Sequence, residues 1–388
     1  MDRQDRGSRL VWLAAICASL TVALLYATAE SIPGAAATTT CDAANPFDAL
    51  PDDVALQACL DNADWVLLKP GNRPGYVGYI LANTIKLKHD HILLTSAEIP
   101  HKVTFIAAPA LTEPLLRVSL TNDVSEANNF EISFIRFDGD RDHRSVRDKP
   151  CDGGHHYENV DLAGTGFHIR YVESYRAVCG SGMVVGGANN FEIYGSAFYD
   201  NGRQPDEANG IAGLWADGLT VFGCVRSTIR DNVFWDNTDI DLGVNGGTSC
   251  AVYRNTISHS WKYAFAGLVA GDPSRSDGEF SGNVVSSDYN LLGFGIVVGC
   301  HPWGACRGGY ASNIWVHDNR STGAVVNLAV DGLNGGRVEN NSMSGAQGDR
   351  VLNCKVSADY TAGHFFNMSS LQRGFVYRTF DAGSTCEP

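Results

Sequence analysis

A short segment built around asparagine recurs along the second half of the chain. The segments RDNVF, YRNTI, SGNVV, HDNRS and ENNSM each place one asparagine at the same point: Asn232, Asn255, Asn283, Asn319 and Asn341. The intervals are irregular, and the shortest is 22 residues. A repeat of this length is typical of solenoids, in which each coil buries its apolar face only against its neighbours.

A second series of apolar segments alternates with the first. Each ends in or near glycine and has the length of a short strand. Two or three strands in each repeat, with insertions of variable length at the corners, predict a parallel solenoid. Stacked coils place like residues about 4.8 Å apart, so the asparagines are expected to form an internal ladder. The members of this second series are SGMVVGG (181–187), DGLTVFG (217–223), DIDLGVN (239–245), AFAGLVAG (264–271), GFGIVVG (293–299) and VVNLAVDG (325–332).

The chain begins with features of an export signal. Three arginines precede an apolar run from Leu10 to about Ala29, and small residues follow it. Residues 1–37 are therefore predicted to be a secretory signal peptide, or an uncleaved signal anchor, and 41–388 a single secreted or extracytoplasmic domain. Ten cysteines follow the signal, which fits an oxidising compartment. The simplest pairing is between near neighbours: 41–59, 151–179, 224–250, 300–306 and 354–386.

The asparagine coils, a predicted helix at 51–62 and the segment FDGDRDHR (137–144) together resemble a known fold. They resemble the right-handed parallel β-helix of the pectate-lyase superfamily. The resemblance implies an all-β solenoid with a short N-terminal capping helix, coils over about 65–345 and a C-terminal cap over about 350–388. Closed ends imply a monomer. Because this superfamily includes hydrolases, lyases, epimerases and phage tailspikes, the fold does not choose an activity.

Overall charge excludes one class of partner. The formal net charge is −14 and no basic cluster occurs, which argues against nucleic acid. It also argues weakly against a polyanionic substrate.

Three aspartates stand at the start of two apolar segments. Asp217 and Asp239 are expected at equivalent places on neighbouring coils, with Asp241 on the same face as Asp239 because strand side chains alternate. Carboxylates this close repel each other, so at least one pKa should rise. A protonated acid beside an ionised partner is what glycosidic cleavage needs, and no metal is required. The alternative is that these aspartates cap turns or bind a structural cation.

Around these aspartates the motif match to one group of hydrolases is partial. Asn237-Thr238-Asp239 resembles the Asn-Thr-Asp motif of polygalacturonase-type hydrolases. The Gly-His-Gly and Arg-x-Lys motifs of that group are absent from the following strands.

The next coil offers a different chemistry. His259, Lys262 and Tyr263 precede the following strand, and each could be the base of a lyase or C5-epimerase acting on a uronate, assisted by Ca²⁺. The alternative is a solvated lysine and a tyrosine packed at the edge of the groove. Asp138, Asp140 and Asp142 alternate in a way that could bind Ca²⁺, although a structural corner is favoured.

Candidate substrate-binding residues lie in the same region: Trp215, Trp235, Trp261 and Asn245. The tryptophans could stack on sugar rings, and core packing is the alternative for each. Two long insertions, 143–165 and 199–216, are expected to build the binding face. The leading hypothesis is a secreted glycoside hydrolase acting on a polysaccharide. The alternatives are a polysaccharide lyase or C5-epimerase, and a non-catalytic glycan-binding surface protein.

Overall fold

The computed structural model describes residues 38–118, 127–146, 157–271, 276–288, 291–299, 311–331 and 333–344, and three further strands at 353–359, 365–366 and 385–387. The predicted signal or anchor at 1–37 lies outside these residues. Within the described ranges, no helix is long and apolar enough to cross a bilayer.

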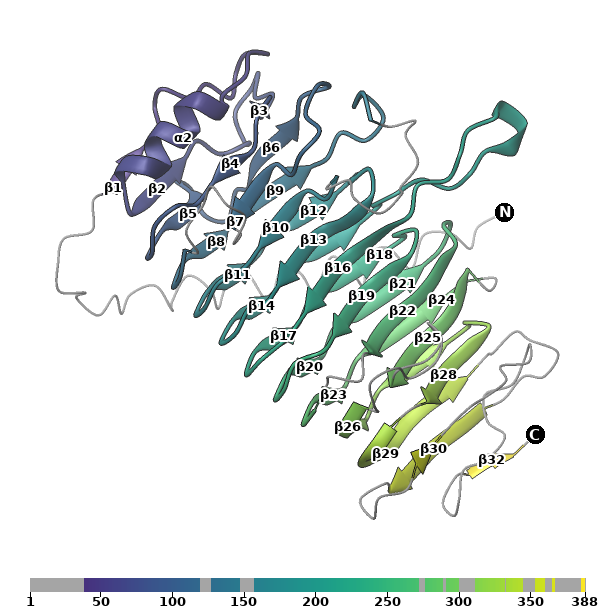
Figure 1. Cartoon of the computed structure of the whole chain (residues 1–388). Coiled ribbons are helices and arrows are strands. Elements are labelled where there is room, and N and C mark those ends of the chain that lie inside the picture. The colour runs from purple at the N-terminus through teal and green to yellow at the C-terminus, as the bar shows by residue number, and fades with distance from the viewer. Residues whose placement is uncertain are drawn as a thin grey trace. The chain divides into compact units, whose positions relative to one another are not determined.

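Short parallel strands stack in three columns, and each coil visits the columns in turn (Figure 1). One coil, for example, runs through β14 (Glu192–Tyr194), β15 (Ala197–Tyr199) and β16 (Ala216–Phe222) before β17 (Thr228–Arg230) pairs with β14. The first two columns meet at β29 (Leu333–Ser344), which pairs with the last strand of each. The third column is a separate nine-stranded sheet. The predicted all-β, right-handed parallel β-helix is thereby confirmed.

The first column contains β1 (Thr38–Thr40), β2 (Trp65–Leu68), β5 (Leu93–Ser96), β8 (Glu131–Ser133), β11 (His168–Arg170), β14, β17, β20 (Ala251–Tyr253), β23 (Glu279–Ser281) and β26 (Ala311–His317). The second contains β3 (Tyr79–Leu81), β6 (Val103–Ala107), β9 (Ile135–Asp138), β12 (Glu173–Tyr175), β15, β18 (Val233–Trp235), β21 (Thr256–His259), β24 (Val284–Ser287) and β27 (Arg320–Thr322). The third contains β4 (Ile85–Lys86), β7 (Leu116–Val118), β10 (Val160–Leu162), β13 (Gly180–Gly186), β16, β19 (Ile240–Asn245), β22 (Ala264–Gly271), β25 (Leu292–Gly299) and β28 (Val326–Asp331).

The asparagine ladder predicted from the repeats runs along the corner between the first and second columns. Asn232 donates from Nδ2 to Oδ1 of Asn255 at 3.1 Å, and Asn255 donates in the same way to Asn283 at 3.0 Å. Asn283 to Asn319 and Asn319 to Asn341 continue the series at 2.9 Å each. All five side chains are buried, so each carboxamide satisfies groups that water cannot reach.

One helix, α2 (Asp53–Asn62), lies at the N-terminal end of the coils (Figure 1). Leu56 and Leu60 are buried, as expected for residues four apart on one face. Val54 is 78% exposed, because two residues along a helix turn the side chain to the other side. Cys59 bonds to Cys41, so this predicted disulfide is confirmed and ties the helix to the strand before it.

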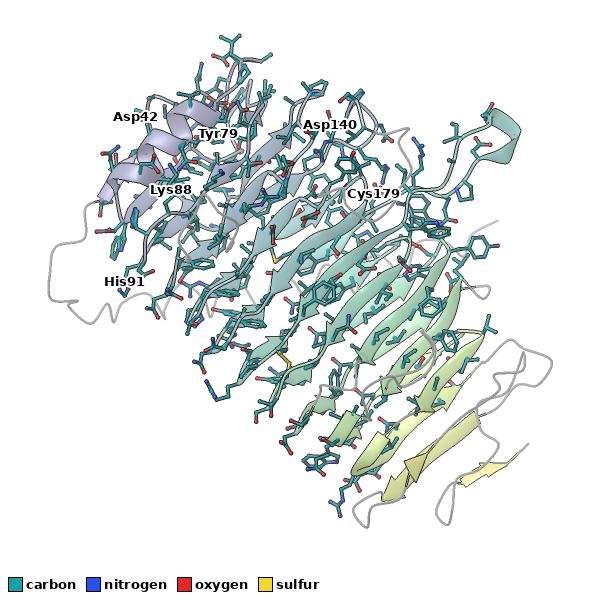
Figure 2. The ribbon with its side chains drawn as sticks, in the orientation of Figure 1. Asp42, Tyr79, Lys88, His91, Asp140 and Cys179 are labelled. Atoms are coloured by element: carbon teal, nitrogen blue, oxygen red, sulfur yellow. A yellow bond between two sulfur atoms is a disulfide. The ribbon has the colours of Figure 1, made fainter. Side chains whose placement is uncertain are left out.

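The central coils carry a second predicted disulfide, between Cys224 and Cys250. It joins neighbouring coils 26 residues apart in sequence. Cys179, which Figure 2 labels, is also disulfide-bonded. The predicted partner of Cys179 and both members of another predicted pair lie outside the described residues: Cys151, Cys300 and Cys306.

Strands near the C-terminus change direction. β30 (Asn353–Asp359) and β31 (Phe365–Phe366) pair with β29 in the antiparallel sense, and β32 (Thr385–Glu387) pairs likewise with β30. The register of β30 and β32 sets Cys354 opposite Cys386, as the predicted pairing of these cysteines requires. The C-terminal cap itself stays a prediction.

Candidate functional site

Two half-buried aspartates lie at the corner that leads from the second column into the third. Asp217 is the second residue of β16, and Asp239 immediately precedes β19. Because β16 and β19 are parallel neighbours, the two aspartates belong to adjacent coils.

Hydrogen bonds hold the Asp217 carboxyl in one orientation. Its Oδ1 accepts the backbone N–H of Ile240 at 2.9 Å, and its Oδ2 accepts the hydroxyl hydrogen of Thr220. The Thr220 hydroxyl in turn lies 2.7 Å from that of Ser181 on the preceding coil. Thr220 and Ser181 are both buried, so this chain of hydroxyls is shielded from water.

The two aspartates share an electrostatic environment that favours one proton between them. Burial, and then the negative charge of Asp239, raise the pKa of Asp217 to about 8. Burial also raises the pKa of Asp239. Carboxylates that repel each other in a poorly solvated site do not both ionise at neutral pH. The pair therefore has the protonated and ionised members that acid–base chemistry requires.

Asp241 lies inside the coils, not beside Asp239 on the outer face as strand alternation predicts. In the six strands of the third column from β13 to β28, two consecutive residues face inward, which breaks the alternation. Leu242 packs in the core, and Asp241 is fully buried next to it. The register from Leu219–Leu242 aligns Asp217 with Ile240, so the expected alignment of Asp217 with Asp239 is wrong by one residue.

His259 is the partner of Asp241. Its Nε2 lies 2.7 Å from Oδ2 of Asp241, and its Nδ1 lies 2.8 Å from the carbonyl oxygen of Lys262. A carbonyl only accepts, so Nδ1 carries a hydrogen. Burial alone would lower the pKa of His259, but the charge and hydrogen bond of Asp241 outweigh it and raise that pKa. The two form a buried ion pair, which places both predicted catalytic groups out of a substrate's reach.

Lys262, predicted either as a solvated side chain or as a base, is buried as well. Its Nζ donates to Oδ1 of Asp200 and, at 3.1 Å, to the carbonyl oxygen of Gly202. Burial lowers the pKa of Lys262, against the opposing charge of Asp200. The preceding turn is fixed by Asp236, whose Oδ1 accepts three successive backbone N–H groups from Ser260 to Lys262. Lys262 therefore has a structural role, in which it links its turn to Asp200 and Gly202.

Exposed aromatic side chains surround the same corner. Trp215 is 50% exposed, and Trp261 and Tyr263 are each 60% exposed. Trp215 stands two residues before Asp217, and Tyr263 two residues before Phe265, whose N–H donates to the carbonyl oxygen of Asp239. Trp215 and Trp261 were predicted to contact a substrate, and both offer apolar surface without core packing.

Trp235 and Asn245 lie at different distances along the chain from Asp239. Trp235 ends β18 in the second column, where its ring stacks on Tyr199 at a centroid distance of 3.9 Å. Asn245 ends β19, six residues after Asp239, which is about 20 Å along an extended strand. The structure thus places Trp235 at the start of the corner and Asn245 at the far end of β19.

An arm formed by the 199–216 insertion projects beside the site (Figure 1). Arg203 and Leu214 exchange backbone hydrogen bonds of 2.8 and 2.7 Å, so the arm is an antiparallel hairpin. At its tip is a short 3₁₀ turn, η2 (Glu207–Asn209). Gln204 donates from Nε2 to the carbonyl oxygen of Tyr263 at 2.7 Å, which fixes the base of the arm to the later coil.

Beyond Asp217 the outer face of the third column becomes apolar. On the later coils, the residues in register with Asp217 or with Thr220 are apolar. They form a buried cluster that is separate from the main core. The aspartate pair lies where the outer face changes from polar to apolar. The cluster contains Ile240, Ala266, Val269, Val297, Val326 and Ala329.

Four polar residues of the corner carry no signal in the sequence. Thr220 and Ser181 support Asp217 only because of the register between coils, and Asp200 and Asp236 meet Lys262 and its turn through the same register. A short-range motif search has no access to such contacts.

Of the alternating aspartates at 138–142, Asp138 ends β9, and Asp140 and Asp142 follow in the corner loop, where Figure 2 labels Asp140. Basic side chains engage each of them: Arg176 pairs with Asp138, His143 with Asp140 and Arg141 with Asp142. Over the described residues, no group of three or more histidines, cysteines or acidic residues is arranged to hold a metal ion.

No protein-family model matches the sequence. No curated protein matches it either. Among solved structures, the surface adhesin PfbA of Streptococcus pneumoniae aligns with 86% of this chain and 99% of its own, at 13% identity and a TM-score of 0.50. The A-module of mannuronan C-5 epimerase AlgE6 of Azotobacter vinelandii aligns with 79% of this chain and 94% of its own, at 14% identity and a TM-score of 0.46. An alginate lyase from Paenibacillus sp. str. FPU-7 aligns with 72% and 96%, at 14% identity and a TM-score of 0.42. At these identities the likeness is one of fold.

Proposed function

We propose that this chain is a polysaccharide-acting glycoside hydrolase whose acid–base pair is Asp217 and Asp239. The observation that carries the proposal is the pair itself: two half-buried carboxyls on adjacent coils, with the pKa of Asp217 raised by burial and by Asp239 to about 8. A carboxylic acid that stays protonated at neutral pH, beside a carboxylate, is the arrangement that glycosidic hydrolysis uses.

In this mechanism Asp217 is the general acid. Its proton passes to the glycosidic oxygen as the bond from that oxygen to the anomeric carbon breaks. Asp239, ionised, either takes a proton from the attacking water or bonds to the anomeric carbon itself. Thr220 and the Ile240 N–H orient the Asp217 carboxyl throughout and are positioning groups.

Sugar binding is assigned to the exposed aromatics of the corner. Trp215, Trp261 and Tyr263 offer flat apolar surfaces of the kind that pack on sugar rings, and the hairpin arm forms one side of the site. The disulfides fit an oxidising compartment, so we place the protein outside the cytoplasm.

The lyase or epimerase alternative has less support. Two of its three candidate bases, His259 and Lys262, are tied into buried ion pairs with Asp241 and Asp200. Only Tyr263 is exposed and available. Of the activities considered, only the lyase or epimerase would be assisted by Ca²⁺.

The test is a screen of the purified protein against neutral and uronic polysaccharides, with calcium and with chelator, reading reducing ends and ultraviolet absorbance. Asp217→Asn and Asp239→Asn should each lose at least about a hundredfold in kcat, the range for a general acid or base. The matched control is Asp231→Asn. Asp231 is on the same coil as Asp239 but lies at the corner between the first and second columns.

Three results would overturn the proposal. Calcium-dependent absorbance would indicate a lyase. Product formation unchanged in both variants would remove the pair from catalysis. Absence of product on every polymer, with binding retained, would leave a glycan-binding protein.

A further inference from the structure

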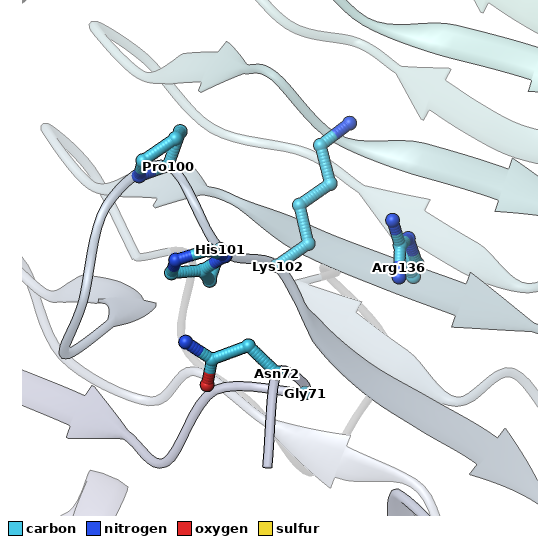
Figure 3. Close-up of a pocket in the computed structure, with 6 residues that line it drawn as sticks. All are labelled: Gly71, Asn72, Pro100, His101, Lys102 and Arg136. Atoms are coloured by element: carbon cyan, nitrogen blue, oxygen red, sulfur yellow. The ribbon is translucent and has the colours of Figure 1, made fainter.

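A small basic pocket lies on the early coils, away from the aspartate pair. The loop between β2 and β3 lines it with Gly71 and Asn72, and the segment before β6 with Pro100, His101 and Lys102. Arg136 of β9 completes the lining. Figure 3 shows His101 and Asn72 next to each other and the Lys102 side chain extending away from them.

The charges of this pocket do not cancel. Glu173 of β12 accepts hydrogen bonds from Lys102 Nζ at 2.7 Å and from Arg136 Nε at 3.1 Å. Glu173 thus faces two cations. His101 adds a third basic side chain, next to Glu98, whose own charge is paired with Arg73 at 2.6 Å. Burial raises the pKa of Glu173, but the charges of Lys102 and Arg136 outweigh it and hold that pKa below its ordinary value. The surplus is therefore positive, in a chain whose net charge is −14.

The guanidinium of Arg136 is the group best placed to bind. Its Nε is occupied by Glu173, while no bond from either terminal nitrogen is seen in the described part of the chain. The side chain is 42% exposed, so these donors can reach a ligand. A guanidinium presents paired N–H groups that match the two oxygens of a carboxylate or sulfate.

We propose that this pocket binds an oxyanion. Its volume, about 220 Å³, is below the range for drug-sized ligands, so the ligand is one small charged group. Arg136 donates to it from the terminal nitrogens, and His101 and Asn72 close the opposite side. The anion is either an acid group carried on a saccharide or a free inorganic ion.

An aromatic stack on the same strand column favours the saccharide. Tyr175, Tyr199 and Trp235 stack at 4.9 and 3.9 Å on successive coils, and the Tyr199 hydroxyl donates to Glu173 at 3.2 Å. The far side of Trp235 faces the coil of Ser258, a small residue in register with it. Trp235 lies three coils away from Arg136 and two residues further along the strand, a separation of about 16 Å. An acidic oligosaccharide could thus place a ring on Trp235 and its acid group in the pocket.

The experiment measures binding by calorimetry to the full chain carrying Asp217→Asn, so that no glycan is consumed. The probes are a uronate oligosaccharide, its neutral counterpart and sodium sulfate. Arg136→Gln should weaken binding of the anions about tenfold or more. The control is Arg320→Gln, an exposed arginine in the same row six coils further on.

The uronate and sulfate measurements distinguish an acid group on a saccharide from a free inorganic ion. Uronate binding that weakens with Arg136→Gln and with Trp235→Ala indicates a saccharide ligand, and sulfate binding that weakens only with Arg136→Gln indicates a free ion. Both support the site. No binding of either anion, or equal affinities for the Arg136 and Arg320 variants, overturns it. The saccharide source rests on the proposed function, but the sulfate arm does not, so the two proposals can fail separately.

Discussion

At the scale of single residues, the direction of a side chain decides what an aspartate does here. Asp217 points out of the coil, is half-buried and meets a second carboxyl, so its proton is retained. Asp241 points in, where Asn237 donates to Oδ1 at 2.8 Å and His259 contacts Oδ2. Two aspartates on neighbouring coils thereby differ in role: Asp217 retains a proton on the outer face, and Asp241 forms an ion pair in the interior.

The raised pKa of Asp217 has a consequence for stability. In the unfolded chain this carboxyl ionises near pH 4, whereas in the folded chain it keeps its proton to about pH 8. Between these values the folded state binds the additional proton, so stability falls as pH rises. Asp217→Asn removes this loss. Its melting temperature relative to the parent should be higher at pH 8 than at pH 5, as measured by calorimetry.

Asp231→Asn is the control with the opposite sign. Hydrogen bonding from Arg254 lowers the pKa of Asp231, so this group stabilises the fold above its unfolded pKa. The variant should lose stability at neutral pH, and this loss should shrink as the pH falls through the folded pKa of Asp231. If both variants behave alike across pH, the protonation assigned to Asp217 is incorrect.

The His259–Asp241 pair should dominate stability at the corner. His259→Gln leaves Asp241 charged and unpaired in the interior, which typically costs about 3–5 kcal/mol of unfolding free energy. His143→Gln, at an exposed pair with Asp140, should cost less than about 1 kcal/mol. Urea denaturation at pH 6 measures both. Equal losses would contradict the buried pair.

The same pair has a pH signature. Because the folded pKa of His259 is raised, its stabilisation is complete below about pH 6.5 and declines as pH rises through the folded value. His259→Gln should flatten the stability profile above pH 6.5. A profile unchanged by the substitution would mean that His259 is neutral in the folded state.

At the scale of elements, the repeat explains both what the sequence predicts well and what it misses. Five asparagines at one point of a repeat can all be satisfied only by stacking, so the ladder and the parallel strands were predictable. The register within the third column was harder, because two inward residues in succession break strand alternation. The sequence did contain a signal for this register. Among the six strands from β13 to β28, the position that Asp241 occupies in β19 is glycine in four others: Gly182, Gly218, Gly267 and Gly295.

Glycine at that position reports crowding inside the coil. A Cβ on Gly218 would lie 2.5 Å from the carbonyl oxygen of Asp241 and 2.9 Å from the Phe234 ring. Aligning the strands on these glycines would have placed Asp241 in the interior. The ion pairs of His259 and Lys262 were beyond such reasoning, since they depend on where the corner turns carry each side chain.

The ladder makes a prediction of its own. Asn255 accepts from the backbone N–H and Nδ2 of Asn232, and it donates to Ile229 and Asn283. Asn255→Ala leaves several of these buried groups unpaired, at a cost of about 3 kcal/mol or more. Asn209→Ala, at the exposed tip of the arm, should change stability by less than about 0.5 kcal/mol. Chemical denaturation would show no difference between the two variants if the ladder were unimportant.

At the scale of the whole described unit, stability is a sum over neighbouring coils. Each strand of a column pairs only with the strands before and after it, so a local defect is felt mainly by adjacent coils. Two of the disulfides test this because they lie in different places. Cys41–Cys59 closes the N-terminal end at the helix, and Cys224–Cys250 joins central coils. In the chain-entropy model each contributes about 3 kcal/mol.

Removing each disulfide should therefore loosen a different part of the molecule. With Cys41→Ala and Cys59→Ala, amide hydrogen exchange should accelerate in β1 to β5 and fall off toward the centre, because an end can fray without opening its neighbours. With Cys224→Ala and Cys250→Ala, the acceleration should centre on β16 to β22, where both flanking stacks must part for an amide to open. Exchange that rises evenly along the chain in both variants would contradict the coil-by-coil description. It would indicate that the solenoid opens as one cooperative unit.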